Sequence, residues 1–106
     1  MSKPGSRVLG IDTSLRSTGV GVVEAQGSSL KAVDFGFLKT TPKWPHSRCL
    51  ACIADGVSCI IAETKPTAVA IEGAFFFKNA KTAMVLGEAR GVAIATCAAA
   101  GIPVYE

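Results

Sequence analysis

The chain has 106 residues, of which 49% are hydrophobic and 18% are charged, and its formal net charge is +3 at pH 7. This length is typical of one domain, so we expect residues 1–106 to form a single unit. The apolar composition excludes a disordered chain, and the small positive charge permits a polyanionic partner without requiring one.

Three strands are predicted at the start of the chain. Residues 7–12 form a short apolar run that ends in Asp12, and residues 19–24 form a second run joined to it by a polar connection, which indicates a β-hairpin. Residues 26–29 are of types that favour turns. Apolar and polar side chains alternate over residues 30–39, which predicts a third, antiparallel strand. We therefore expect an antiparallel meander.

A helix and a fourth strand follow the proline-containing connection at residues 40–45. Apolar side chains recur at helical spacing over residues 46–64, which predicts a helix there. Residues 67–72 form a short apolar run that ends in a carboxylate, Glu72, just as the first strand ends in Asp12. The two strands are thus expected to be buried and to carry an acid at the same end.

A second helix is predicted over residues 80–100, with Asn79 as its N-cap, and residues 102–105 begin a fifth strand. Small side chains recur along this helix at intervals of three or four residues, and such side chains let a neighbouring backbone approach closely. The neighbour is either the sheet or a helix of another protomer. The stripe consists of Ala80, Ala83, Gly87, Gly91, Ala95 and Ala98.

The order of the elements predicts a mixed five-stranded α/β fold, with three antiparallel strands followed by right-handed βαβ crossovers. The fourth strand should arrive beside the first, which places Asp12 next to Glu72. Neighbouring carboxylates repel unless a cation lies between them, and oxygen ligands favour Mg²⁺ or Mn²⁺ over zinc. Two acids that merely end their strands are the alternative, and the residues alone leave both interpretations open.

The location of the protein is expected to be cytoplasmic, without a membrane partner. Residues 1–6 contain no apolar segment of the kind that a secretory signal needs, and the apolar residues 83–102 are interrupted by Glu88 and Arg90. Free thiols are then expected. Cys49 and Cys52 form a CxxC pattern near His46, which is typical of zinc or redox sites, but cysteines beside a helical apolar stripe are more often small hydrophobes.

Two stretches of the chain resemble the corresponding parts of the RuvC family of Holliday-junction resolvases. They are residues 7–24, RVLGIDTSLRSTGVGVVE, and residues 70–94, AIEGAFFFKNAKTAMVLGEARGVAI, with GFLKT at residues 36–40 between them. The resemblance covers nearly the whole chain, and FKNA followed by LGEARG is its most specific part. It implies a ribonuclease H-like fold and a metal-dependent endonuclease that hydrolyses phosphodiester bonds of four-way DNA junctions.

The resemblance also implies site residues. Asp12 and Glu72 match the first two catalytic carboxylates, both of them ligands of Mg²⁺ (or Mn²⁺). Phe75 matches the aromatic residue that the family places near the branch point, where a ring can stack on an unpaired base.

Lys78, Lys81 and Arg16 are expected near the same end of the fold, where they could contact phosphates. Symmetric cutting of a four-way junction further implies a homodimer that binds branched DNA. The resemblance also implies branch-migration proteins as partners in the cell.

The chain departs from the family pattern in two ways. Thr13 and Ser14 stand where the family usually has Pro-Gly, so the turn after Asp12 is expected to differ. The family also continues into a C-terminal helix that supplies two further acidic ligands, and neither Glu88 nor Glu106 matches their positions. We therefore expect this chain, C-terminally truncated relative to the family, to have an incomplete active site and to be inactive alone.

Two other functions remain open from the sequence. A non-catalytic junction-binding module or inactive remnant would bind branched DNA without metal-dependent nicking. An actin-like ATPase lobe is less favoured: residues 10–12 and 19–21 resemble the phosphate-binding hairpin of that superfamily, whereas Glu72 and the loop at residues 75–78 argue against it. Stabilisation of the protein by ATP would favour the ATPase.

Overall fold

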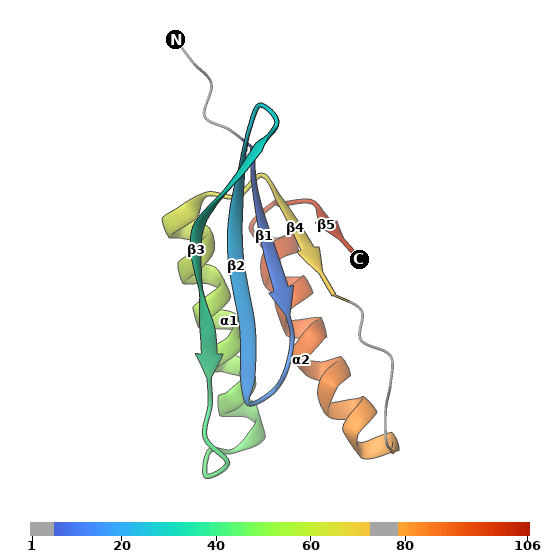
Figure 1. Ribbon diagram of the computed structural model, residues 1–106. Coiled ribbons are helices and arrows are strands. Elements are labelled where there is room, and N and C mark those ends of the chain that lie inside the picture. Colours follow the sequence, from blue (N-terminus) through green and yellow to red (C-terminus); the bar gives the residue numbers. More distant parts are fainter. Residues whose placement is uncertain (1–5, 73–78) are drawn as a thin grey trace.

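The computed structural model describes residues 6–72 and 79–106. Each predicted strand and helix is present, although β2 begins two residues earlier than predicted, at Ser17, because Ser17 and Thr18 pair with β3. The strands β4 and β5 are shorter than predicted. The elements are β1 (Arg7–Asp12), β2 (Ser17–Gln26), β3 (Ser29–Lys39), α1 (His46–Thr64), β4 (Ala68–Ile71), α2 (Ala80–Ala99) and β5 (Val104–Tyr105) (Figure 1).

The strands form one mixed sheet in the order β3-β2-β1-β4-β5. The strand β1 is antiparallel to β2 and parallel to β4, which confirms the predicted position of the fourth strand beside the first. The strand β5 runs parallel to β4. The carboxyl ends of β1 and β4 therefore lie side by side at one end of the sheet, next to the start of β2.

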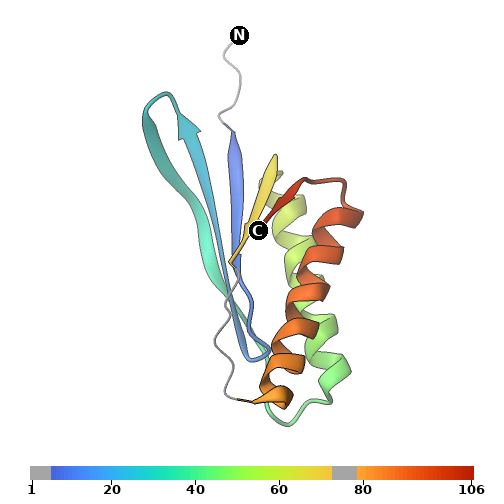
Figure 2. The same ribbon diagram turned by 90° about the vertical axis from the view of Figure 1, so that its right-hand side faces the viewer.

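Both helices lie on the same face of the sheet (Figure 2). Side chains alternate between the two faces of a strand, so every second residue of the central strands points into the core. The opposite face, which no described helix covers, is called the open face below. The buried strand residues that face the helices are Leu9, Ile11, Val20, Val22, Val69 and Ile71.

The helix α1 has the bounds that its apolar periodicity predicts. Ile53 and Val57 are fully buried against the sheet. The helix ends at Thr64, and the capping residue Lys65 takes the left-handed conformation with φ 49° and donates its N–H to the carbonyl of Ile61 at 2.8 Å. Pro66 then prevents continuation of the helix.

The helix α2 begins at its predicted N-cap, because the side chain of Asn79 accepts a hydrogen bond from the N–H of Thr82 at 2.9 Å. Ala89, Ala93 and Cys97 form its buried side. Gly87, Gly91, Ala95 and Ala98 of the predicted small-residue stripe are exposed. Of the two predicted neighbours, the sheet is therefore wrong for these residues, and a helix of another protomer stays a prediction. By length and composition α2 could cross a membrane. Only 17% of the tested segment is buried, so most residues of this apolar helix are at least partly exposed.

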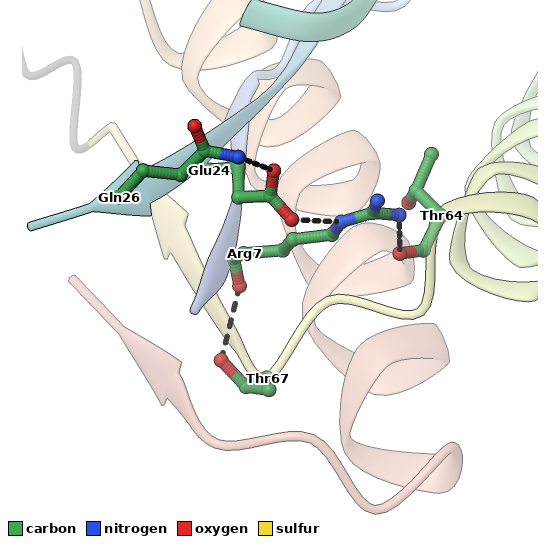
Figure 3. A network of polar contacts seen from close by, with 5 residues as sticks. All are labelled: Arg7, Glu24, Gln26, Thr64 and Thr67. Carbon is green, nitrogen blue, oxygen red and sulfur yellow. Dashed lines mark hydrogen bonds and ion pairs between the residues drawn. The ribbon is translucent and has the colours of Figure 1, made fainter. Parts of the chain in front are cut away.

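A polar network closes the end of the sheet away from Asp12 (Figure 3). Nε of Arg7 donates to Glu24 at 3.1 Å, and Nη1 of Arg7 donates to the carbonyl of Thr64 at 2.8 Å. Gln26 donates to the second carboxylate oxygen of Glu24 at 2.8 Å. The hydrogen bond from Arg7 lowers the pKa of Glu24 most, burial opposes it, and Gln26 lowers it further.

We predict that this network makes stability depend on pH through Glu24. A carboxyl group whose pKa is lowered by folding stabilises the protein above its unfolded pKa of about 4.3, and that stability is lost as the pH falls through the lowered pKa. Glu24→Gln should therefore unfold at lower urea concentration than the wild type near pH 7, and the two midpoints should converge in acid. Glu63→Gln, on the exposed face of α1, is the control. If the urea midpoints of Glu24→Gln and the wild type differed by the same amount at every pH, the prediction would be contradicted.

Candidate active site on the open face

Asp12 and Glu72 lie next to each other at the carboxyl ends of β1 and β4. Ile11 is paired with Ile71 in the parallel register, and the N–H of Glu72 donates to the carbonyl of Ile11 at 3.1 Å. Since Ile11 and Ile71 point into the core, the next residue on each strand points to the open face. Both acids are exposed and line the same pocket, as the strand order predicts.

The two carboxylates have the chemistry of a hard-cation site. Neither forms an ion pair with any described residue, and ionised carboxylates offer only acceptor oxygens. Glu106 lines the same pocket, but its carboxylate is bound to Nη2 of Arg90 at 2.8 Å. Within residues 6–72 and 79–106 no three acidic, histidine or cysteine side chains gather at one point, so the described site offers two ligands for a cation.

The floor of the pocket is made of residues with little or no side chain. Gly10, Gly19, Gly21 and Ala70 lie beside the carboxylates. A Cβ atom added at Gly10 or Gly21 would meet no atom nearer than 3.8 Å, so packing within the chain does not require glycine there. The sheet backbone is thus accessible from the open face, where a ligand or another segment can approach closely.

Exposed aromatic rings stand beside this floor. Phe35 and Phe37 of β3 are 81% and 66% exposed, and Tyr105 of β5 is 63% exposed. All three line the pocket. The sequence did not predict these rings or the glycine floor. Gly19 and Gly21 point to the same face of β2, and Gly21 pairs with Gly10 of β1, so the spacing of these glycines could have indicated an open patch of backbone.

The connection after Asp12 is held by a buried threonine. Oγ1 of Thr18 accepts a hydrogen bond from the N–H of Ser14 at 3.2 Å and donates to the carbonyl of Ser14. Thr18 is fully buried, as is most of Leu15. These contacts fix the turn in which Thr13 and Ser14 stand.

Arg16 is anchored to the segment before α1 by part of its guanidinium group. Its Nη1 donates to the carbonyl of Thr41 at 3.0 Å and approaches Sγ of Cys49 at 3.5 Å. The residue is otherwise exposed, so a phosphate contact remains a prediction. Lys81 is exposed in the first turn of α2.

Phe75 and Lys78 lie outside the described residues. Their predicted roles in stacking and phosphate contact therefore stay predictions.

The four cysteines are free thiols, with Cys49 and Cys97 buried. Burial raises the pKa of the Cys97 thiol, which makes it a poor nucleophile. His46 of the CxxC neighbourhood lies 3.3 Å from a carboxylate oxygen of Glu88 on α2. Cys49 and Cys97 thus behave as small core residues.

The chain matches the family model of the crossover junction endodeoxyribonuclease RuvC over residues 8–106. Two relatives of that description are 44% identical over 100 residues in Myxococcus xanthus and 45% identical over 100 residues in Chloroflexus aggregans. Each match covers 94% of this chain but 52% and 61% of the respective relatives. The chain therefore spans between half and two thirds of the length of these proteins.

Solved structures agree with the fold. Thermus thermophilus RuvC, in complex with a Holliday junction substrate, superposes with a TM-score of 0.88 at 30% identity, covering 93% of this chain and 63% of that one. The yeast mitochondrial Holliday junction resolvase superposes with a TM-score of 0.66 at 13% identity, over 97% of this chain and 52% of its own, which shows a shared fold alone. The mixed five-stranded sheet with its helices is thus ribonuclease H-like.

Proposed function

The chain belongs to the RuvC family of crossover junction endodeoxyribonucleases, and we propose that the protein containing it resolves four-way DNA junctions by metal-dependent phosphodiester hydrolysis. The observation that carries the proposal is the pairing of Asp12 with Glu72 on the open face. In phosphodiester hydrolysis, carboxylate-held cations activate water and stabilise the leaving oxygen.

Asp12 and Glu72 fit Mg²⁺ or Mn²⁺ and would hold the ion between neighbouring strand ends. Both are oxygen donors, both are exposed, and neither is neutralised by an ion pair with a described residue. Hard divalent cations take such ligands, whereas zinc sites usually contain histidine or cysteine. The rigid strand backbones set the relative positions of the two acids, so little reorganisation is needed when a cation binds.

Branched DNA is the substrate class in this proposal. Phe75 stacks at the branch point, and Lys78, Lys81 and Arg16 neutralise phosphates of the arms. Lys81 supports this arrangement by its exposure on the first turn of α2. A cytoplasmic location and contact with branch-migration proteins belong to the same proposal.

The direct test compares the affinity of the chain for a synthetic four-way junction with its affinity for a linear duplex of equal length. Preference for the junction that persists as the salt concentration rises supports the proposal, since phosphate contacts alone give no such preference. Equal affinities for the two DNAs contradict it. Stabilisation by ATP without DNA binding would instead support the ATPase alternative.

A junction-binding role without cleavage is the second candidate for this chain. All eight acidic residues of the sequence lie in the described part, and two of them meet at the open pocket free of ion pairs. Two carboxylates are few for a pair of catalytic cations. Binding without nicking is therefore the outcome expected of the chain by itself.

A homodimer through α2 completes the proposal. The exposed side of α2 carries Gly87, Gly91, Ala95 and Ala98, and a Cβ added at either glycine would meet no atom within 4 Å. The chain itself therefore does not require these glycines, whereas a second helix packed closely against them would. A two-fold axis would also present two sites to the two strands that a symmetric cut needs.

We predict that Gly91→Gln shifts the chain from dimer to monomer while stabilising the monomer. The longer side chain obstructs close helix packing, but glutamine is more favourable than glycine in a helix by about 0.5 kcal/mol. Sedimentation equilibrium reads the first effect, and thermal unfolding at low protein concentration reads the second. Ser58→Gln on the exposed side of α1 is the control, and a dimer unaffected by Gly91→Gln would place the interface elsewhere.

A further inference from the structure

A basic corner lies at the junction of β3 and α1, at the same end of the sheet as Asp12. The strand β3 ends there at Lys39, and α1 starts at His46 (Figure 1). We call the surface formed by Lys39, Lys43, Trp44 and Arg48 the β3–α1 corner. None of these residues belongs to the predicted catalytic or junction-binding set.

The charges of the β3–α1 corner are available to a partner. Lys39, Lys43 and Arg48 are all exposed, and none forms an ion pair with a described residue. Asp55 is the acidic residue lining the groove between β3 and α1 at this point. Three cations against one carboxylate leave a positive surface, which suits a polyanion.

Trp44 and Arg48 form a preorganised stacked pair. The guanidinium carbon of Arg48 lies 4.1 Å from the centre of the Trp44 ring, within the range of a cation–π contact. The N–H of Trp44 donates to the carbonyl of Thr41 at 3.1 Å, and the N–H of Arg48 donates to that of Pro45 at 3.0 Å. The backbone and the ring therefore both restrain this arginine, which lowers the entropy lost when it binds a phosphate.

The β3–α1 corner is tied to the connection that follows Asp12. The N–H of Thr40 donates to the carbonyl of Arg16 at 3.0 Å, and its hydroxyl donates to the carbonyl of Leu15 at 2.6 Å. Arg16 returns a hydrogen bond to the carbonyl of Thr41 at 3.0 Å. These bonds fix the corner relative to the connection that follows Asp12.

Phe37 joins the two surfaces. It lines the pocket of Asp12 and Glu72 and also the groove of the β3–α1 corner. A Cβ placed on Gly19 would lie 3.6 Å from the Phe37 ring and 3.8 Å from Cβ of Asp12, so the ring and the acid flank the same glycine. A path along the protein surface thus leads from the carboxylates past Phe37 to the basic corner.

We propose that the β3–α1 corner binds the sugar–phosphate backbone of a duplex arm, beyond the phosphate that a cation held by Asp12 and Glu72 would contact. The inference rests on the proposed function and adds to it a contact surface for one arm. Lys39, Lys43 and Arg48 neutralise phosphates, and the contact is independent of base sequence and of branching. Its task is to hold an arm at a fixed distance from the carboxylates.

Trp44 provides the test, because it is the only tryptophan of the chain. Its fluorescence in the unaltered protein should change on titration with linear duplex and with a four-way junction, and the change should disappear at high salt. Lys39→Ala should lower the slope of log affinity against log salt by about 0.9 for both DNAs, because one phosphate contact is lost. Lys31→Ala removes the same charge from an exposed position near the other end of β3 and should leave the slope unchanged.

The outcomes separate this inference from the proposed function. If the junction binds tightly while Trp44 fluorescence stays constant and Lys39→Ala behaves like Lys31→Ala, the corner is not a DNA contact and the junction-binding proposal stands. If Trp44 responds but linear duplex binds as well as the junction, the corner is supported and junction selectivity fails. Absence of any DNA binding overturns both.

Discussion

Phe75→Ala should weaken binding of the chain to a four-way junction by about 5- to 150-fold, with little effect on linear duplex. Stacking of a base on an aromatic ring contributes about 1–3 kcal/mol, and only the junction offers unpaired base faces. Affinity titrations with both DNAs at several salt concentrations give the measurement. The prediction depends on the family resemblance of residues 70–94, since Phe75 lies outside the described residues.

Lysine variants supply the contrast to Phe75→Ala. Lys78→Ala and Lys81→Ala should weaken both DNAs alike and reduce the salt dependence, because phosphates carry no information about branching. If Phe75→Ala lowered both affinities equally, or neither while circular dichroism showed a folded protein, Phe75 would be a core residue. Its role at the branch point would then be lost.

The 106-residue chain should bind Mn²⁺ at Asp12 and Glu72 yet leave a synthetic four-way junction uncut in Mg²⁺ or Mn²⁺. Two-metal cleavage uses ions about 3.5–4 Å apart, and two carboxylates are too few to hold such a pair in place. Gel analysis of end-labelled junctions reads cleavage, and electron paramagnetic resonance reads free Mn²⁺. We expect no cleavage product from this chain, whereas an active resolvase would cut the same junction.

Two substitutions sharpen this prediction. Asp12→Asn should weaken Mn²⁺ binding, because an amide removes the charge of one ligand, whereas Asp34→Asn on the exposed part of β3 should not. Efficient symmetric nicking by the pure chain, abolished by Asp12→Asn, would prove the prediction wrong. In that case two carboxylates would suffice for catalysis.

The sequence by itself determined the element order and the pairing of the two acids. The helix over residues 46–64 could be predicted because its apolar residues keep one period from start to end. Asp12 and Glu72 could be paired because a crossover strand must join a free edge of the meander, which leaves few arrangements. Both inferences need only local pattern and general rules of topology.

The tertiary structure decided which side of α2 is buried. Small residues occur on every side of this helix. The sequence pattern therefore does not distinguish Ala89 and Ala93, which are buried, from Gly87 and Gly91, which are exposed. Packing against α1 and the sheet made the choice. The same holds for Arg16, whose partner Thr41 lies 25 positions away along the chain.

Only the three-dimensional arrangement also connects the carboxylates to the basic corner. Phe37 lines both surfaces because β3 pairs with β2 and β2 with β1, which brings its ring beside Gly19 and Asp12. In the sequence Phe37 is one of several apolar residues in an alternating strand, and alternation does not say which face a helix covers. Side-chain partners come from contacts between distant segments, and those contacts exist only once the sheet and the helices have packed together.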